Sequence, residues 1–154
     1  MKKINPAYIE AVKREVNECP YFRLLTISLE NFEWGQCRIE LSLSEKHLQP
    51  YRFVHGGVFA SLIDAAAFWA VHTQIDDGLE MTTAELNVNY LKPATKGRMI
   101  GIGRSIKVGK MLCLGEASIE DEEGTLLAHG TATLVIMEDL EFNSKSYLPK
   151  KYLE

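Results

Sequence analysis

VHGGVFASLIDAAAFWAV, residues 54–71, is the part of this 154-residue sequence that decides the fold. Between Val58 and Val71, every face of the helix that it predicts is apolar or small, apart from Ser61 and Asp64. A helix that is apolar on all sides is buried on all sides. The stretch therefore predicts a central helix, from Gly56 to about Gln74, that the rest of the chain encloses.

Asp64 is the one ionisable residue in this apolar run. Burying a carboxylate is costly unless it is hydrogen-bonded or paired, so its presence needs a reason. It could cap a neighbouring element or bind backbone amides at a dimer seam, or it could act on a substrate. Taken alone, this residue favours neither interpretation.

His55, Gly56 and Gly57 stand at the start of the same helix. The first amides of a helix lack internal partners and the helix dipole makes that end positive, so it can stabilise the oxyanion of a thioester under attack. The plainer alternatives are a tight loop-to-helix turn at the two glycines and a loop histidine with a structural hydrogen bond.

The spacing of these groups has a consequence for assembly. Gly57 and Asp64 are seven residues apart, which is ~10 Å along one helix. One carbonyl carbon cannot easily lie within ~3 Å of both groups. Two antiparallel copies of the helix would bring the amide end of one subunit to Asp64 of the other. Chemistry at this motif therefore predicts a homodimer with two equivalent composite sites.

The remaining segments predict one α+β domain over residues 1–154. An amphipathic helix is expected from Asn5 to Glu18, with Asn5 as its cap. We expect an antiparallel sheet that wraps around the central helix, a core in residues 20–137, and a loose polar tail in residues 139–154. Short turns separate the expected strands, which are Arg23–Asn31, Gly35–Leu43, Thr82–Leu91, Arg98–Val108, Met111–Glu120 and Leu126–Met137.

Composition narrows the class of protein. The net charge of −4 argues against a nucleic-acid binder, and the apolar run in the central helix is shorter than the ~20 residues of a membrane span. The basic first residues are followed by no signal-peptide core. The four histidines form no ligand cluster, so no metal is expected.

Three widely spaced cysteines, Cys19, Cys37 and Cys113, are typical of reduced thiols in a cytoplasmic protein.

Two motifs together resemble a known family. VHGGVFASLID, residues 54–64, and TTAELNVNYLKPA, residues 82–94, are similar to the hotdog-fold thioesterases. The nearest group is the acyl-CoA thioesterases of the phenylacetic-acid-degradation type, related to the 4-hydroxybenzoyl-CoA thioesterases. The resemblance implies a hotdog fold with an extra N-terminal helix and a hydrolase that acts on acyl-CoA. It also implies a homodimer or homotetramer, and no cofactor beyond the CoA of the substrate.

The resemblance assigns roles by position in the motif. Asp64 takes the place of the acidic nucleophile or general base. Gly56, directly after the family's histidine at His55, or else Gly57, supplies the amide that polarises the thioester carbonyl.

At two positions the sequence departs from the family pattern. Gln49 stands where the family commonly has an asparagine that helps to place the water or the leaving group. Thr83 stands where a serine often orients the attacking water. These differences make the supporting residues of the site harder to assign than Asp64.

A basic stretch could hold the phosphates of CoA, as the resemblance implies. Residues 86–115 contain no acid. Their lysines and arginines can serve as phosphate ligands, or they can be charged residues that protect exposed strand edges from pairing. The residues assigned to CoA are Lys92, Arg104, Lys107 and Lys110.

Two rival functions share this fold. A 3-hydroxyacyl-CoA dehydratase pairs a differently placed histidine with an acid, and an acyl-CoA sensor would bind without catalysis. The order His55-Gly-Gly and the acid at Asp64 favour hydrolysis. The acyl group stays open, because aromatic residues such as Phe59, Phe68, Trp69 and Tyr90 are as typical of a core as of an aryl or medium-chain pocket.

Overall fold

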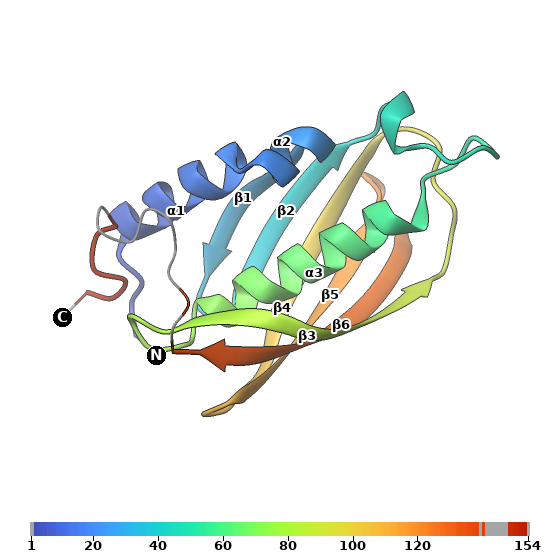
Figure 1. The fold of residues 1–154 in the computed structure, drawn as a ribbon. Helices are drawn as coiled ribbons and strands as arrows, with labels where there is room; N and C mark the ends of the chain where they lie inside the picture. The colour runs from blue at the N-terminus through green and yellow to red at the C-terminus, as the bar shows by residue number, and fades with distance from the viewer. Residues whose placement is uncertain (1, 139, 141–147, 154) are drawn as a thin grey trace.

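The computed structural model describes residues 2–138, 140 and 148–153. Its centre is the helix α3 (Gly56–His72), which lies across the concave face of a six-stranded antiparallel sheet (Figure 1). The strand order is β1-β2-β4-β5-β6-β3, so β1 and β3 form the two edges. The strands are β1 (Ile27–Glu33), β2 (Gln36–Ser42), β3 (Glu80–Tyr90), β4 (Arg98–Val108), β5 (Leu112–Glu120) and β6 (Leu126–Met137).

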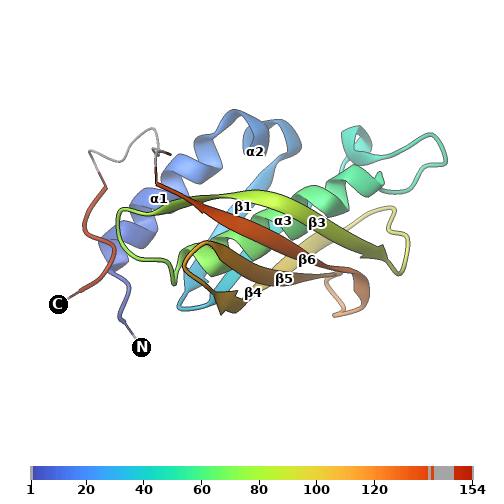
Figure 2. The ribbon, with the colours of Figure 1, turned by 60° about the horizontal axis from the view of Figure 1, so that its bottom comes forward.

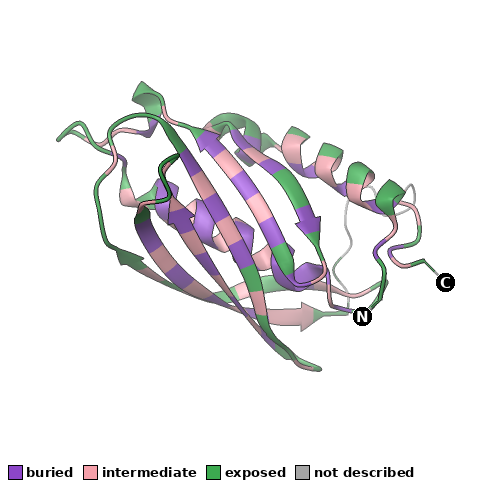
Figure 3. Ribbon diagram, turned by 180° about the vertical axis from the view of Figure 1, so that it is seen from behind, coloured by how far each residue is buried: buried purple, intermediate pink, exposed green. Residues whose placement is uncertain are grey.

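Small residues let α3 lie very close to the middle of the sheet. A Cβ atom at Gly103 of β4 would stand 2.0 Å from the Ala66 carbonyl oxygen, and one at Gly115 of β5 would stand 2.8 Å from that of Ala67. Both alanines are fully buried. The predicted central helix and the sheet that wraps around it are thus confirmed. Figure 3 shows the outer face of the sheet, where buried residues alternate with more exposed ones along the strands.

Two further helices cover the side of the molecule next to β1 (Figures 1 and 2). Helix α1 (Pro6–Glu18) is capped by the Asn5 side chain, as predicted. Its Tyr8, Val12 and Val16 are buried in the core, so the core begins well before residue 20. Helix α2 (Pro20–Leu25) follows at once, and a short 3₁₀ helix (Glu45–His47) precedes α3.

The predicted strand Arg23–Asn31 is wrong in its first part. Pro20 ends α1, but it also occupies the first position of α2, where its missing N–H has no cost. Thr26 then takes the left-handed conformation, with φ 56°, and ends the helix. The strand therefore begins only at Ile27. The other predicted strands agree with the structure to within two residues at each end.

The expectation of a loose polar tail is wrong for Leu148–Leu153, whereas residues 139, 141–147 and 154 lie outside the described residues. Tyr152 pairs with Ile4 in a β-bridge, and Lys151 is 1% exposed. A charged side chain is buried here because it reaches backbone carbonyls at the end of α3. Across the described helices, none has the length and apolar character needed to cross a membrane.

Candidate active site

Asp64 lies in the middle of α3 with its carboxylate half-buried. The Thr83 hydroxyl on β3 donates a hydrogen bond of 2.7 Å to Asp64 Oδ1. This bond orients the carboxylate and leaves Oδ2 without a donor among the described residues. Two of the positions that the family motif singled out, Asp64 on α3 and Thr83 on β3, are therefore brought together.

The start of α3 has one capped and one uncapped amide. The Gly57 N–H donates to His55 Nδ1 at 2.8 Å, so His55 is the N-cap residue and carries its proton on Nε2. The Gly56 N–H has no acceptor within the described part of the chain. Of the two predicted amides, only that of Gly56 is therefore open to a substrate without displacing a hydrogen bond.

Tyr90, at the end of β3, lies over this open amide end. Its hydroxyl is 3.4 Å from the Gly56 carbonyl oxygen, and a Cβ atom on Gly56 would stand 3.2 Å from its ring. A side chain at Gly56 would therefore crowd the Tyr90 ring, which would have to shift by a few tenths of an ångström.

The hydrogen bonds of Gln49 are made within its own loop. Its side-chain oxygen is 3.4 Å from the Tyr51 N–H, and its backbone pairs with Arg52 and Phe53 in the same loop. The side chain therefore supports the loop before α3, and its role in placing water or the leaving group stays a prediction.

A cavity of about 460 Å³ opens beside Asp64, between α2 and α3. Its walls are mostly apolar, with Phe22, Phe68 and Leu86 among them. The polar exceptions, besides Asp64, are Tyr21 and Ser61. A carboxylate on the wall of an apolar cavity is a common arrangement for a site that binds an apolar substrate and acts on it.

Tyr21 and Ser61 form a polar pair that the sequence analysis missed. The Ser61 hydroxyl donates to the Gly57 carbonyl at 2.8 Å, and the two hydroxyl oxygens are 2.7 Å apart. Because Ser61 has a single hydroxyl proton, Tyr21 is the donor between them. A signal for Ser61 did exist, because Ser61 and Asp64 are three residues apart and so share one face of the helix.

The residues assigned to CoA are spread over both ends of the chain's central helix. Lys92 lies near the start of α3, because the neighbouring Ala94 carbonyl accepts from Val54. Lys110 shares a cavity with Gln74 at the opposite end of α3, and Lys107 is on the same β4–β5 hairpin. One subunit therefore does not gather these lysines around Asp64.

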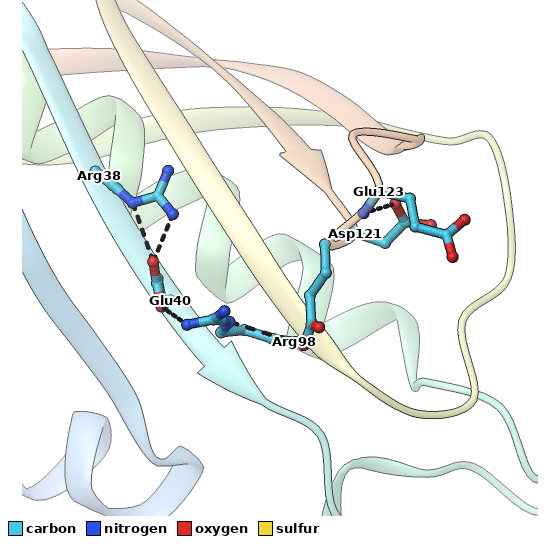
Figure 4. A network of polar contacts seen from close by, with 6 residues as sticks. Arg38, Glu40, Arg98, Asp121 and Glu123 are labelled. Carbon is cyan, nitrogen blue, oxygen red and sulfur yellow. Dashed lines mark hydrogen bonds and ion pairs between the residues drawn. The ribbon is translucent and has the colours of Figure 1, made fainter.

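In the fold, arginines of the acid-free stretch, residues 86–115, form ion pairs with acids from other parts of the chain. Arg104 forms an ion pair of 2.5 Å with Glu116 on β5, and its guanidinium lowers the pKa of that carboxyl. Arg98 pairs with Glu40 at 3.1 Å and with Glu122 at 3.8 Å, while Arg38 shares Glu40 (Figure 4). Figure 4 also shows Asp121 accepting from the Glu123 N–H in the adjoining turn. These arginines are partly neutralised, which weakens them as phosphate ligands.

Comparison with known proteins agrees with this geometry. The thioesterase superfamily model matches residues 51–128. A protein of Saccharolobus solfataricus that bears an esterase name, SSO1253, is 34% identical over 140 residues, which are 87% of this chain and 90% of the relative. The 1,4-dihydroxy-2-naphthoyl-CoA hydrolase of Listeria monocytogenes is 28% identical over 110 residues, 71% of this chain and 89% of the relative.

The fold is also similar to that of solved thioesterase structures. The crystal structure of thioesterase HI1161 from Haemophilus influenzae superposes with a TM-score of 0.81 at 20% identity, covering 93% of this chain and 99% of the other. The chain therefore belongs to the thioesterase superfamily, and its fold is the hotdog fold. It is a hydrolase of the thioesterase class.

Proposed function

We propose that the protein hydrolyses acyl-CoA thioesters in the cytoplasm, with Asp64 as the general base or nucleophile. The observation that carries this proposal is the position of the Asp64 carboxylate. It is held by Thr83 through one oxygen, and it lies on the wall of a mostly apolar cavity. CoA is the carrier that we assign because the Listeria relative is named for a CoA thioester.

Either role of Asp64 gives a balanced reaction. As a general base, its free oxygen takes a proton from water while the water oxygen bonds to the thioester carbon. The tetrahedral oxyanion then collapses, the C–S bond breaks, and the CoA sulfur receives the proton from Asp64. As a nucleophile, Asp64 forms a mixed anhydride and expels CoA as a thiolate. Water then hydrolyses the anhydride and supplies the proton that the thiolate takes up. In both cases the Gly56 N–H is the donor to the oxyanion.

A homodimer completes the site in this proposal, and a homotetramer would be two such dimers. The amide of Gly56 and the carboxylate of Asp64 are roughly 12 Å apart along α3, by the rise of 1.5 Å per residue. The edge strand β3 runs past Asp64, and its outer side bonds to no strand among the described residues. Antiparallel pairing of two β3 edges would cover that edge and place two α3 helices side by side in opposite directions.

The dehydratase alternative has less support. It needs a histidine and an acid that both reach the substrate, whereas the His55 ring accepts from the Gly57 N–H. His72 does pair with Glu80, but its ring is buried at the opposite end of α3 from Gly56. The sensor alternative differs from ours only in the absence of turnover, so a rate measurement separates them.

Replacement of Asp64 by asparagine tests the proposal. Asp64→Asn keeps the size of the side chain and removes the basic oxygen, so kcat for an acyl-CoA thioester should fall by about two orders of magnitude or more. Release of CoA, followed with a thiol reagent, measures the rate. Asp76→Asn, at an exposed position beyond the other end of α3, is the matched control and should keep wild-type turnover.

The result has a clear contrary outcome. If Asp64→Asn turns over at the wild-type rate with an unchanged circular dichroism spectrum, Asp64 is not the catalytic group. If the wild-type protein binds acyl-CoA and releases no thiol, the sensor function replaces ours.

A further inference from the structure

A second cavity adjoins the one beside Asp64. It has a volume of about 580 Å³ and lies under α1 and α2. Val16, Pro20 and Met81 contribute apolar walls, and Leu140 lies at its edge. The two cavities share three lining side chains, which are Phe22, Phe68 and Trp69. These rings therefore stand between the cavities.

The three rings differ in how firmly they are held. Phe22 and Trp69 are buried, at 8% and 7% exposed, and belong to the core. Phe68 is half-buried and packs edge-on against Trp69, with ring centroids 5.2 Å apart. Of the three, Phe68 is the ring that can be changed without opening the core, so it is the one that can set the width of the passage.

Phe68 also lies about one helical turn from Asp64, beside which the reacting carbon of the substrate is placed. It follows Asp64 by four residues, which is about 6 Å along α3. An extended acyl chain advances roughly 1.3 Å per carbon, given C–C bonds of about 1.5 Å. A butanoyl group therefore ends about 4 Å from its carbonyl carbon and stops short of Phe68, whereas an octanoyl group reaches about 9 Å and extends beyond it.

We propose that the two cavities form one acyl-binding site, roofed by α1 and α2 and divided by Phe68, and that its substrates are thioesters of medium-length straight-chain acids. This inference rests on the proposed function and adds the substrate class to it. The first carbons lie beside Asp64, and the distal carbons pass Phe68 into the cavity under α1.

The far cavity also selects the end of the chain. Its polar side chains are the carboxylates of Glu15, Glu18 and Glu80, and Glu80 is 3.3 Å from the buried His72 ring. Burial lowers the pKa of His72 and favours its neutral form, so the ring supplies no positive charge that would attract an incoming anion. An acyl chain that ends in a methyl group therefore fits, and one that ends in a carboxylate is repelled.

The test measures kcat/KM for butanoyl-, hexanoyl-, octanoyl- and decanoyl-CoA, and for suberyl-CoA, which has the length of octanoyl-CoA and a distal carboxylate. We expect kcat/KM to rise from butanoyl- to octanoyl-CoA and to be at least tenfold lower for suberyl-CoA. Phe68→Trp should lower the value for octanoyl- and decanoyl-CoA at least tenfold and change that for butanoyl-CoA less than twofold. Phe68→Ala should move the preference toward longer chains.

Arg14→Trp is the matched control, because it adds the same ring to the exposed face of α1 away from both cavities. It should retain the wild-type profile. Wild-type rates that are flat with chain length, or a Phe68→Trp variant that loses all substrates equally, would overturn the inference and leave the proposed function standing.

A binding measurement separates the acyl site from the proposed function when the protein shows no hydrolysis. If no thioester is hydrolysed, the proposed function fails, and calorimetric titration with decanoate tests the cavities alone. Binding of decanoate by the wild-type protein and its loss in Phe68→Trp support the acyl site. Equal binding by both proteins, or none by either, contradicts it.

Discussion

At its first turn α3 leaves backbone groups accessible, whereas at its last turn the backbone of the same helix is covered. The first turn has an exposed His55 cap, two glycines and an N–H at Gly56 that is open. At the last turn and just beyond it, Lys151 Nζ donates to the carbonyls of His72 and Ile75, the second at 2.9 Å. The Tyr152 hydroxyl donates to the Ile75 carbonyl at 2.6 Å.

The contrast shows how one helix serves both stability and chemistry. A cation at the C-terminal end is favoured by the helix dipole, and Lys151 supplies the donor for the buried His72 carbonyl. Burial nevertheless lowers the pKa of Lys151 to about 8, although the carboxylates of Glu80, Asp77 and Asp76 act in the opposite direction. The closed end therefore fixes the helix, and the open end is left free to receive a developing negative charge.

The largest effect is expected at the open end. Gly56→Pro removes the N–H at the first position of α3, where proline is well tolerated, and His55 already has the extended conformation, with φ −64° and ψ 137°, that a residue before proline adopts. Loss of one oxyanion donor should reduce kcat by roughly 10²–10³-fold. Gly56→Ala keeps the N–H and adds bulk against Tyr90, so it is the control and should lose far less.

The same variant tests whether the site is shared. Gly56→Pro and Asp64→Ala are each expected to be nearly inactive as homodimers. In a random equal mixture half of the dimers are mixed, and each has one intact site out of two, so roughly a quarter of the wild-type activity should return. If both variants are folded and exchange subunits but no activity returns, each site lies within one subunit.

A substitution at the C-terminal end of α3 should lower the free energy of unfolding and leave kcat unchanged. Lys151→Met leaves the buried His72 carbonyl without its donor and removes one of the two donors of the Ile75 carbonyl, so the free energy of unfolding should fall by about 1–3 kcal/mol in urea titrations. The kcat at 25 °C should stay near the wild-type value. Lys3→Ala changes an exposed lysine in the same region and should unfold like the wild type. A Lys151→Met variant that is as stable as Lys3→Ala would show that the buried lysine contributes nothing net.

The same contrast explains what the sequence allowed us to predict. Helix α3 was predictable because its apolar residues surround it completely, and β4 was located to the residue because turns flank it on both sides. The pattern does not predict α2, because a proline after a helix indicates the end of that helix and Pro20 is also the first residue of the next one. The candidate site was predicted where residues are local in sequence, as with Gly56 and Asp64.

The sequence pattern does not predict contacts between segments that are distant in the chain. The pairing of Arg104 with Glu116 depends on cross-strand register, which composition does not show. Lys151 was assigned to a polar tail because its residue type is normally exposed, and only the geometry of the α3 end explains its burial. The pairing of Thr83 with Asp64 was approached through the family motif and not through periodicity.

The smallest expected effect is the change in the free energy of unfolding with pH. Lys151 binds its proton with a pKa of about 8 in the folded protein and near 10.5 when unfolded, so between these values the unfolded chain binds more protons and stability rises with pH. The slope is at most ~1.4 kcal/mol per pH unit for one group, so we expect about 1–2 kcal/mol between pH 7.5 and 9.5. Above pH 10 the trend should reverse, because burial raises the pKa of Tyr8 and Tyr152 and their unfolded forms ionise first. Urea unfolding of the wild type and Lys151→Met at several pH values measures this as a difference between the two proteins, in which groups common to both cancel. A difference that stays constant from pH 7.5 to 9.5 would mean that Lys151 keeps its ordinary pKa and that its burial at the α3 end is fully compensated.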